Sequence, residues 1–248
     1  FYGAEFIWND VASSGTDLNI TNGNLVSGPS RYPQSDWYSW ALFTTWRKNW
    51  EERLTVQAGL RYNGFGLKAD FSEDLDFYPF PFQTADLNNG ALTGSAGIEW
   101  QPNEQWNVST HFSTAFRSPN VDDIGKVFDS EPGSVVIPNP DLQPEYAYTA
   151  EIDIARRFGQ WLELDVVAYY TLLQDALVRR SFQLNGADSI LYDGEMSQVQ
   201  AMQNAAQATV WGIEGRLEAR LGGGFVFTSS VSYQKGEEEL DDGSTSPL

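Results

Sequence analysis

His111, the only histidine in the sequence, is the first candidate for a chemically active side chain. Ser109 and Ser113 lie two residues to either side of it. A serine hydrolase would also need a third residue to orient the imidazole and donors to stabilise the oxyanion, and no suitable pattern accompanies these residues. A single histidine on a polar face is more typical of a hydrogen-bonded side chain than of a metal or haem ligand. We therefore predict no catalytic residue, no metal site and no resident cofactor, and expect that the protein is not an enzyme.

Arg117 is the second candidate, because a guanidinium group can bind a carboxylate or a phosphate through two parallel hydrogen bonds. It comes just before a long polar loop, residues 118–144. We expect it either to contact a ligand or to be neutralised by Glu99, Glu151 or another carboxylate inside the protein.

Four acidic residues of this loop could in principle bind a hard cation such as Ca²⁺, which takes six to eight oxygen ligands. They are Asp122, Asp123, Asp129 and Glu131. Their spacing matches no known metal-binding loop, so solvated loop carboxylates are the favoured interpretation.

The elements that must position these residues are extended strands. Residues 106–117 alternate strictly between two faces, and the alternation resumes in residues 146–154 after the loop. One face carries Trp106, Val108, Thr110, Phe112, Thr114 and Phe116, followed by Tyr146, Tyr148, Ala150, Ile152 and Ile154. The other face accepts Arg117, Glu151 and Asp153. A period of two over this length indicates strands with an apolar environment on one side and a wet one on the other.

Composition narrows the class of protein. The 248 residues include 15 Lys and Arg against 34 Asp and Glu, a formal charge of −19 that argues against nucleic acid as a partner. There is no cysteine, so disulfides and thiolate metal sites are excluded. No apolar run reaches the roughly 18 residues that indicate a membrane helix. Aromatic residues are frequent, at 14%.

The same alternation recurs along the whole chain. We expect about nine antiparallel strands, with short turns and long loops strictly alternating between them, as in outer-membrane barrels. The predicted strands cover residues 1–9, 37–48, 52–63, 91–101, 106–117, 146–154, 162–170 with a possible extension to 180, 211–221 and 225–233. The long loops span residues 10–35, 64–90 and 118–144, and Asn185-Gly186 predicts a type I′ hairpin turn. Aromatic residues near both strand ends predict two interfacial belts.

These features predict an all-β fold, part of an antiparallel transmembrane β-barrel with lipid outside and a polar lumen. A soluble β-sandwich or β-helix is the alternative. The strands of a sandwich average about five or six residues, however, and its loops have no reason to be sorted by length onto one rim. Single-chain bacterial barrels have an even number of strands. We therefore expect residues 1–248 to be an incomplete wall, cut at both ends from a longer protein.

Two motifs resemble paired sequence boxes of TonB-dependent outer-membrane receptors, particularly those for haem and haemoglobin. The first is Phe116-Arg117-Ser118-Pro119, and the second is Asn139-Pro140-Asp141-Leu142-Gln143-Pro144-Glu145. Residues 204–214, NAAQATVWGIE, and 56–62, VQAGLRY, are also similar to strands of these barrels. The first box has serine where alanine is usual, and residues 121–138 contain no histidine, which haem receptors commonly carry between the boxes.

The resemblance implies a 22-stranded barrel in the outer membrane of a Gram-negative bacterium, closed by an N-terminal plug that this chain lacks. It implies active uptake of a scarce nutrient, an iron complex such as a siderophore or haem above all, with TonB as a partner acting through the plug. A passive porin or a surface adhesin is the alternative. Since a ligand must enter from the loop rim, the candidate contacts are Arg117, Asn120, Asp122, Asp123 and Asn139.

Overall fold

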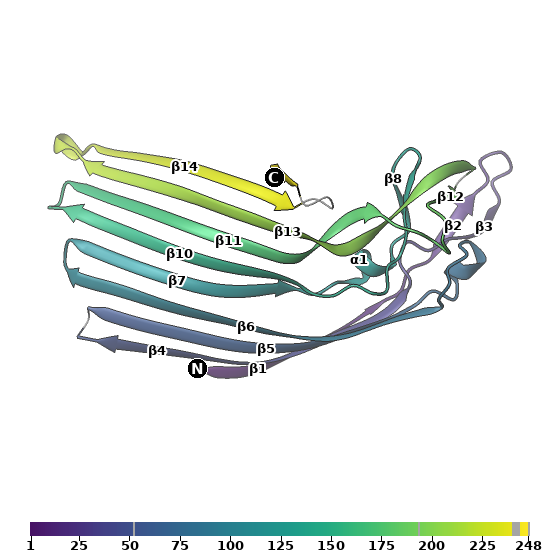
Figure 1. Ribbon diagram of the computed structural model, residues 1–248, viewed down its shortest axis with the longest axis horizontal. Helices are drawn as coiled ribbons and strands as arrows, with labels where there is room; N and C mark the ends of the chain where they lie inside the picture. The colour runs from purple at the N-terminus through teal and green to yellow at the C-terminus, as the bar shows by residue number, and fades with distance from the viewer. Residues whose placement is uncertain (52, 193, 240–243, 248) are drawn as a thin grey trace.

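In the computed structural model, which describes residues 1–51, 53–192, 194–239 and 244–247, nine long strands form one curved wall (Figure 1). Each strand pairs antiparallel with its neighbours in chain order, from β1 to β14, and the wall is not closed into a barrel. The strands are β1 (Tyr2–Val11), β4 (Gln34–Trp50), β5 (Leu54–Asp70), β6 (Thr84–Asn103), β7 (Trp106–Arg117), β10 (Glu145–Phe158), β11 (Leu162–Ser181), β13 (Glu195–Arg220) and β14 (Val226–Glu239). The predicted all-β, antiparallel barrel fragment is confirmed.

The connections are sorted by length, as predicted. The short turns β4–β5, β6–β7, β10–β11 and β13–β14 all lie at one end of the wall, on the left of Figure 1. The long connections gather at the opposite end. We call these ends the short-turn rim and the long-loop rim. A chain that alternates short and long connections between antiparallel strands can only place them this way.

One face of the wall is apolar and yet exposed. Leu60, Leu92, Val166 and Val231 lie in the middle of their strands and are 47–70% exposed. In a soluble sheet these positions would be packed against a second layer, whereas in a barrel wall they face lipid. The opposite, polar face carries ion pairs, such as Arg61–Glu5 at 3.0 Å. The two environments predicted from the alternation are therefore both present.

Aromatic rings accumulate near both rims. At the short-turn rim Trp46 and Trp50 meet edge to face, with 6.3 Å between ring centroids. Towards the long-loop rim, the rings of Trp40 and Tyr62 lie 5.5 Å apart. Such belts are expected where amphipathic rings meet the two membrane–water interfaces.

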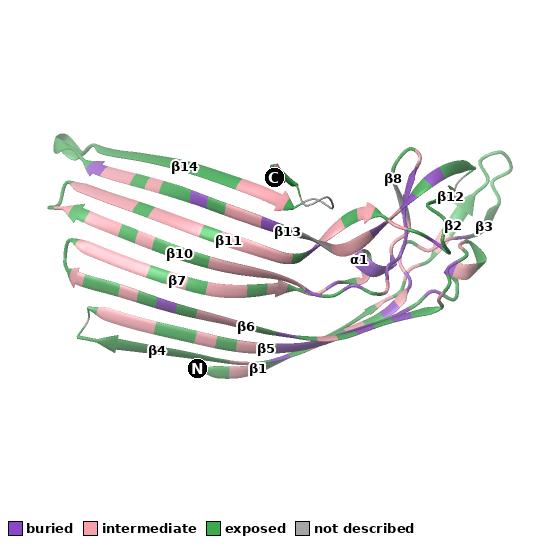
Figure 2. Cartoon of the chain, viewed as in Figure 1, coloured by how far each residue is buried: buried purple, intermediate pink, exposed green. Residues whose placement is uncertain are grey.

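Several strands extend well beyond the wall. β5 and β6 stay paired from Leu54–Trp100 to Asp70–Thr84, so about half of the expected loop 64–90 is strand. β13 begins at Glu195, far ahead of the predicted start at residue 211. These extensions contain buried residues, shown in Figure 2 by the purple segments near the long-loop rim. The buried apolar side chains of β5 and β6 there are Phe65, Leu67, Ala69, Ala85 and Leu87. In β5 and β6 these side chains lie on the face opposite to outward residues of the wall such as Leu60 and Leu92, so the period of two continues but the apolar face changes. A change of face hides the continuation of a strand from a pattern that follows one face.

The other long connections also contain regular structure. Residues 10–35 include the hairpin β2 (Gly15–Leu18) and β3 (Leu25–Gly28). Residues 118–144 include the short helix α1 (Val121–Gly125) and the hairpin β8 (Phe128–Glu131) and β9 (Ser134–Val136), and β9 pairs parallel with β13. Asn185 and Gly186 have φ of 52° and 79°, which confirms the type I′ turn ahead of β12 (Ser189–Tyr192). Among the described residues, no helix has the length and apolar character needed to cross a bilayer.

The hydrophobic core lies at the long-loop rim rather than inside the wall. We call this cluster the rim core. It consists of Leu67, Ala69, Phe71, Phe80, Ala85, Leu87, Ile124, Val135, Ile137, Leu142, Leu184, Val199 and Ala201. Its members come from β5, β6, α1, β9, β13 and the segments between them. The long connections therefore form one packed body instead of separate solvated loops.

Candidate functional site

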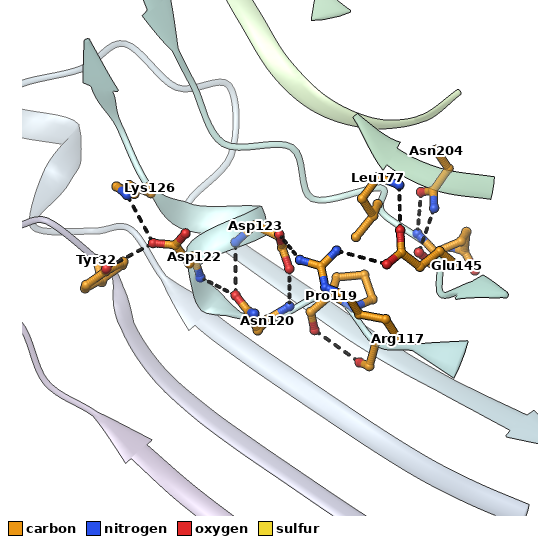
Figure 3. Close-up of polar contacts among 12 residues, drawn as sticks. Tyr32, Arg117, Pro119, Asn120, Asp122, Asp123, Lys126, Glu145, Leu177 and Asn204 are labelled. Carbon is orange, nitrogen blue, oxygen red and sulfur yellow. Dashed lines mark hydrogen bonds and ion pairs between the residues drawn. The ribbon is translucent and has the colours of Figure 1, made fainter. Parts of the chain in front are cut away.

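Arg117 ends β7 at the long-loop rim and joins two carboxylates (Figure 3). Its Nη2 lies 2.6 Å from Oδ1 of Asp123, and its Nη1 lies 3.4 Å from Oε1 of Glu145. The side chain of Asp123 is 7% exposed and that of Glu145 is 18% exposed, whereas Arg117 keeps 44% exposure. One guanidinium group thus neutralises two largely buried acids. Neither is Glu99 or Glu151, the partners that the sequence had suggested by name.

Asn120 and Asp123 form a reciprocal cap on α1. Oδ1 of Asn120 accepts hydrogen bonds from the backbone N–H groups of Asp122 (2.8 Å) and Asp123 (3.2 Å). Oδ2 of Asp123 accepts the backbone N–H of Asn120 at 3.0 Å. This capping box satisfies backbone donors that the start of a helix leaves free. Asp123 therefore uses one carboxylate oxygen for the helix and the other for Arg117.

Asp122 faces away from Arg117. Its Oδ1 accepts a hydrogen bond from the hydroxyl of Tyr32 at 2.9 Å and lies 3.3 Å from Nζ of Lys126 (Figure 3). The side chain of Asp122 is 53% exposed. The contact with Tyr32 connects α1 to the loop that leads into β4.

The second sequence box is fixed from both ends. Oε2 of Glu145 accepts the backbone N–H of Leu177 at 2.8 Å, next to an irregular pairing between β11 and β13. Asn204 forms 2.7 Å hydrogen bonds with both the N–H and the C=O of Gln143, and its Nδ2 also donates to the C=O of Asp175 at 2.9 Å. Asp175 has a positive φ of 55°, and the bond from Asn204 helps to hold this bulge.

Asn139 lies in a different place from the Arg117 network. Its Nδ2 donates to the backbone C=O of Met202 at 2.7 Å, and its Oδ1 accepts the N–H of Asp141 at 3.1 Å. The residue is buried, with 6% exposure. It closes the turn before Leu142, whose side chain enters the rim core.

The structure brings three of the five predicted contact residues together. Arg117, Asn120 and Asp123 form one hydrogen-bonded unit, Asp122 lies on the other side of α1, and Asn139 contacts β13. Nothing in these contacts tests ligand binding, which stays a prediction. The sequence analysis missed the roles of Tyr32, Glu145 and Asn204. Glu145 and Asn204 are, however, end residues of the motifs quoted for the resemblance, which is the signal that pointed to them.

His111 lies on the polar face in the middle of β7, opposite Gly97 and Glu151. It lines an open hollow of about 360 Å³ together with Gln57 and Asp153. Within the described residues, no hydrogen bond joins His111 to Ser109 or Ser113, and no group of three or more His, Cys, Asp or Glu residues is arranged to hold a metal ion. The side chain of Asp129, one of the four acidic loop residues, lies outside the described part.

Antiparallel strands with an apolar outer face, short turns at one rim and long loops at the other are typical of outer-membrane barrels. The family model for the β-barrel of TonB dependent receptor-like proteins matches residues 1–247. The chain belongs to the TonB-dependent receptor family. Members of this family are outer-membrane β-barrel receptors of Gram-negative bacteria.

Solved TonB-dependent receptors share the fold of this receptor chain. The copper transporter OprC superposes with a TM-score of 0.71 at 15% identity, over 95% of this chain and 34% of OprC. A double mutant of the Serratia marcescens hemophore receptor HasR, in complex with the hemophore HasA and heme, gives 0.61 at 16% identity over 96% and 45% of the two chains. The FrpB iron transporter of Neisseria meningitidis (F3-3 variant) gives 0.57 at 19% identity over 86% and 28%.

The receptor chain spans between about a quarter and a half of the length of these three structures. All three are transporters or receptors rather than enzymes. The comparison with curated protein sequences finds no match.

Proposed function

We propose that this chain is part of the barrel of an outer-membrane receptor that actively imports a scarce nutrient, in the first place an iron complex such as a siderophore or haem. The observation that carries the proposal is the match of residues 1–247 to the TonB-dependent receptor barrel, in a wall with an exposed apolar face and a packed long-loop rim. In this proposal the nine strands belong to a 22-stranded barrel. A plug domain and its TonB-binding segment lie elsewhere in the protein, and the TonB complex supplies the energy.

The choice of an iron complex is supported by the structural relatives. Among them are the FrpB iron transporter, the ferric yersiniabactin receptor FyuA of Yersinia pestis and the ferric-catecholate receptor Fiu of E. coli. HasR, described in complex with its hemophore and heme, favours haem as a second substrate. OprC is a copper transporter, so copper is a further metal to include in the uptake test, while an iron complex stays the first choice.

Ligand contact is best suited to the predicted residues that keep exposed polar atoms. Arg117 is 44% and Asp122 is 53% exposed in the side chain, and Asn120 is exposed at the start of α1. Asp123 and Asn139 are buried, so direct contact by either would require the rim to open. We propose that Arg117, Asn120 and Asp122 face the incoming ligand, while Asp123 and Asn139 hold the loops that carry them.

Uptake by whole cells tests the function. A strain that lacks the full-length receptor gene should lose accumulation of radiolabelled iron supplied as a siderophore complex or as haem, and the cloned gene should restore it. Active import predicts that a protonophore abolishes the uptake. Uptake that persists with the protonophore would favour a passive porin, and normal accumulation of every iron and copper complex by the deletion strain would contradict the proposal and leave an adhesin as the better choice.

A further inference from the structure

Arg156 lies on the apolar face of the wall between two aromatic rings. It is paired in register with Trp106 on β7, and Phe158 follows two residues later on the same face of β10. The guanidinium carbon is 4.6 Å from the ring centroid of Trp106 and 4.4 Å from that of Phe158. Both rings lie within the distance at which a cation is attracted to an aromatic face. They therefore hold the guanidinium group in a defined position.

The charge of Arg156 has no anionic partner in the described part of the chain. Its Nε is buried without a hydrogen-bond partner, and no ion pair involves its side chain. Its cross-strand neighbour on β11 is Leu164, and the preceding residue on its face is Ile154. The terminal Nη groups keep accessible surface, since only Nε is enclosed. A cation fixed among apolar groups is costly unless an anion approaches it.

Arg157, the next residue, shows the opposite arrangement. It points to the polar face, where its Nε lies 3.2 Å from Oε2 of Glu163. The chain therefore places one arginine with a carboxylate on the polar side of the wall and the other without one on the apolar side. The partner of Arg156 must come from whatever covers the apolar face.

The position of Arg156 across the membrane identifies that partner. It lies two residues from the end of β10, at the short-turn rim. Trp100 near the end of β6, Trp106 at the start of β7 and Trp161 just before β11 belong to the same aromatic belt. Short turns of outer-membrane barrels are periplasmic, and belts of this kind lie at the level of the lipid headgroups. The anions at this level are the phosphate groups of phospholipids.

We propose that Arg156, held by Trp106 and Phe158, binds the phosphate group of a phospholipid in the periplasmic leaflet. The guanidinium group donates two parallel hydrogen bonds from Nη to phosphate oxygens, for which its planar fork is well suited. The acyl chains then lie along the apolar face next to Ile154 and Leu164. The proposal rests on the outer-membrane placement proposed above, but not on the identity of the imported ligand.

The test measures lipid binding to the full-length receptor, purified in detergent and stripped of lipid, by native mass spectrometry. Phosphatidylglycerol is the probe, and diacylglycerol of the same chain length and inorganic phosphate are the comparison compounds. The loss of a charge-assisted hydrogen bond lowers affinity about tenfold, so Arg156→Gln should bind phosphatidylglycerol about tenfold more weakly than the unmodified receptor. Trp106→Leu should also weaken binding, because the guanidinium group loses one of its two rings.

Arg157→Gln is the matched control, with the same chemical change on the polar face, and should bind the lipid normally. Diacylglycerol should bind the receptor with and without Arg156 equally. Equal phosphatidylglycerol binding by Arg156→Gln and the unmodified receptor would overturn the proposal, and so would inorganic phosphate binding as tightly as the lipid. Membrane fractionation of the unmodified receptor separates this result from a failure of the outer-membrane placement itself.

Discussion

At the scale of single residues, Arg117 shows how one side chain can organise a loop rim. It neutralises Asp123, which also caps α1, and Glu145, which also accepts the N–H of Leu177. The loop before β10 and the bulge of β11 are therefore coupled through one guanidinium group. This role does not exclude ligand contact, because nearly half of the Arg117 side chain remains exposed.

Replacing Arg117 by glutamine should loosen this coupling. A hydrogen bond to a charged group contributes about 1.5–3 kcal/mol when shielded, and the exposure of Arg117 reduces the expected loss to about 1 kcal/mol. Hydrogen exchange at the amides of Asp123 and Leu177 should therefore accelerate about fivefold. Arg157→Gln breaks an exposed ion pair at the other rim and should leave both amides unchanged. Equal protection in Arg117→Gln would show that the network does not hold the rim together.

Asp74 is a second residue whose environment can be tested, because its raised pKa makes the local stability depend on pH. It begins the 3-10 helix η1 (Asp74–Asp76), in the loop that connects β5 to β6. Its side chain is buried, and Oδ1 accepts a 2.7 Å hydrogen bond from the hydroxyl of Ser30. Burial raises the pKa of Asp74 above its ordinary 3.8, and the hydrogen bond from Ser30 opposes this only in part. Because the folded-state pKa is the higher one, Asp74 contributes stability below the unfolded pKa and loses it as pH rises through the folded value.

The predicted result is a loop that is more stable near pH 4 than at pH 7. The amide of Tyr78, which donates to the C=O of Asp74, reports on this through its hydrogen-exchange protection factor. Asp74→Asn keeps an acceptor for Ser30 and should remove the pH dependence while raising protection at pH 7. Asp76→Asn, an exposed change in the same turn, serves as the control. A protection factor of the unmodified protein that rises from pH 4 to pH 7 would contradict the assignment.

At the scale of elements, the segment 139–145 depends on distant strands for its shape. Asn204 of β13 binds both backbone groups of Gln143, and Asn139 binds the backbone of Met202. The Asn-Pro turn thus packs on β13 and places Leu142 in the rim core. Residues far apart in the chain form one unit here.

Asn204→Ala should release this segment from β13. The N–H and C=O of Gln143 and the C=O of Asp175 would lose their partners, which should reduce local stability by about 1–3 kcal/mol. Limited proteolysis between residues 139 and 144 should become faster, while the transmembrane wall stays folded.

Gln183→Ala is the control, because it removes an exposed side-chain hydrogen bond to Asp188 and should not affect cleavage. Unchanged proteolysis of Asn204→Ala would mean that packing of Leu142 alone fixes the segment.

At the scale of the whole molecule, the two faces of the wall are not interchangeable. Ile152 lies on the apolar face in the middle of β10 and is 42% exposed. An arginine there would face the lipid interior, where it costs about 2–4 kcal/mol in outer-membrane barrels. Ser109→Arg is the matched change on the polar face, where Glu99 and Asp153 are the cross-strand neighbours. We expect Ile152→Arg, but not Ser109→Arg, to lower folding yield into phospholipid vesicles, and equal yields would argue against lipid contact by this face.

The strands of the wall follow from local sequence patterns. Alternation with a period of two is a local property, so strands, their two faces and the order of hairpins could be predicted without knowledge of contacts. The sorting of turns and loops onto opposite rims followed from antiparallel connectivity alone. The type I′ turn at Asn185-Gly186 could also be predicted from the sequence, because it depends only on two adjacent residues that tolerate positive φ.

The conformation of the long loops, in contrast, depends on contacts between distant parts of the chain. The extensions of β5 and β6 bury Leu67 and Leu87 on the face opposite to the lipid-facing residues of the wall. These side chains pack into the rim core, which is formed by distant parts of the chain, so a local pattern does not show the extensions as parts of the same strands. The partners of Arg117 were predicted as a class but not by name, because Glu145 reaches it through strand pairing and Asp123 through the fold of α1. Asn204 and Gln143 are 61 residues apart, and only the closure of the rim core brings such residues into contact.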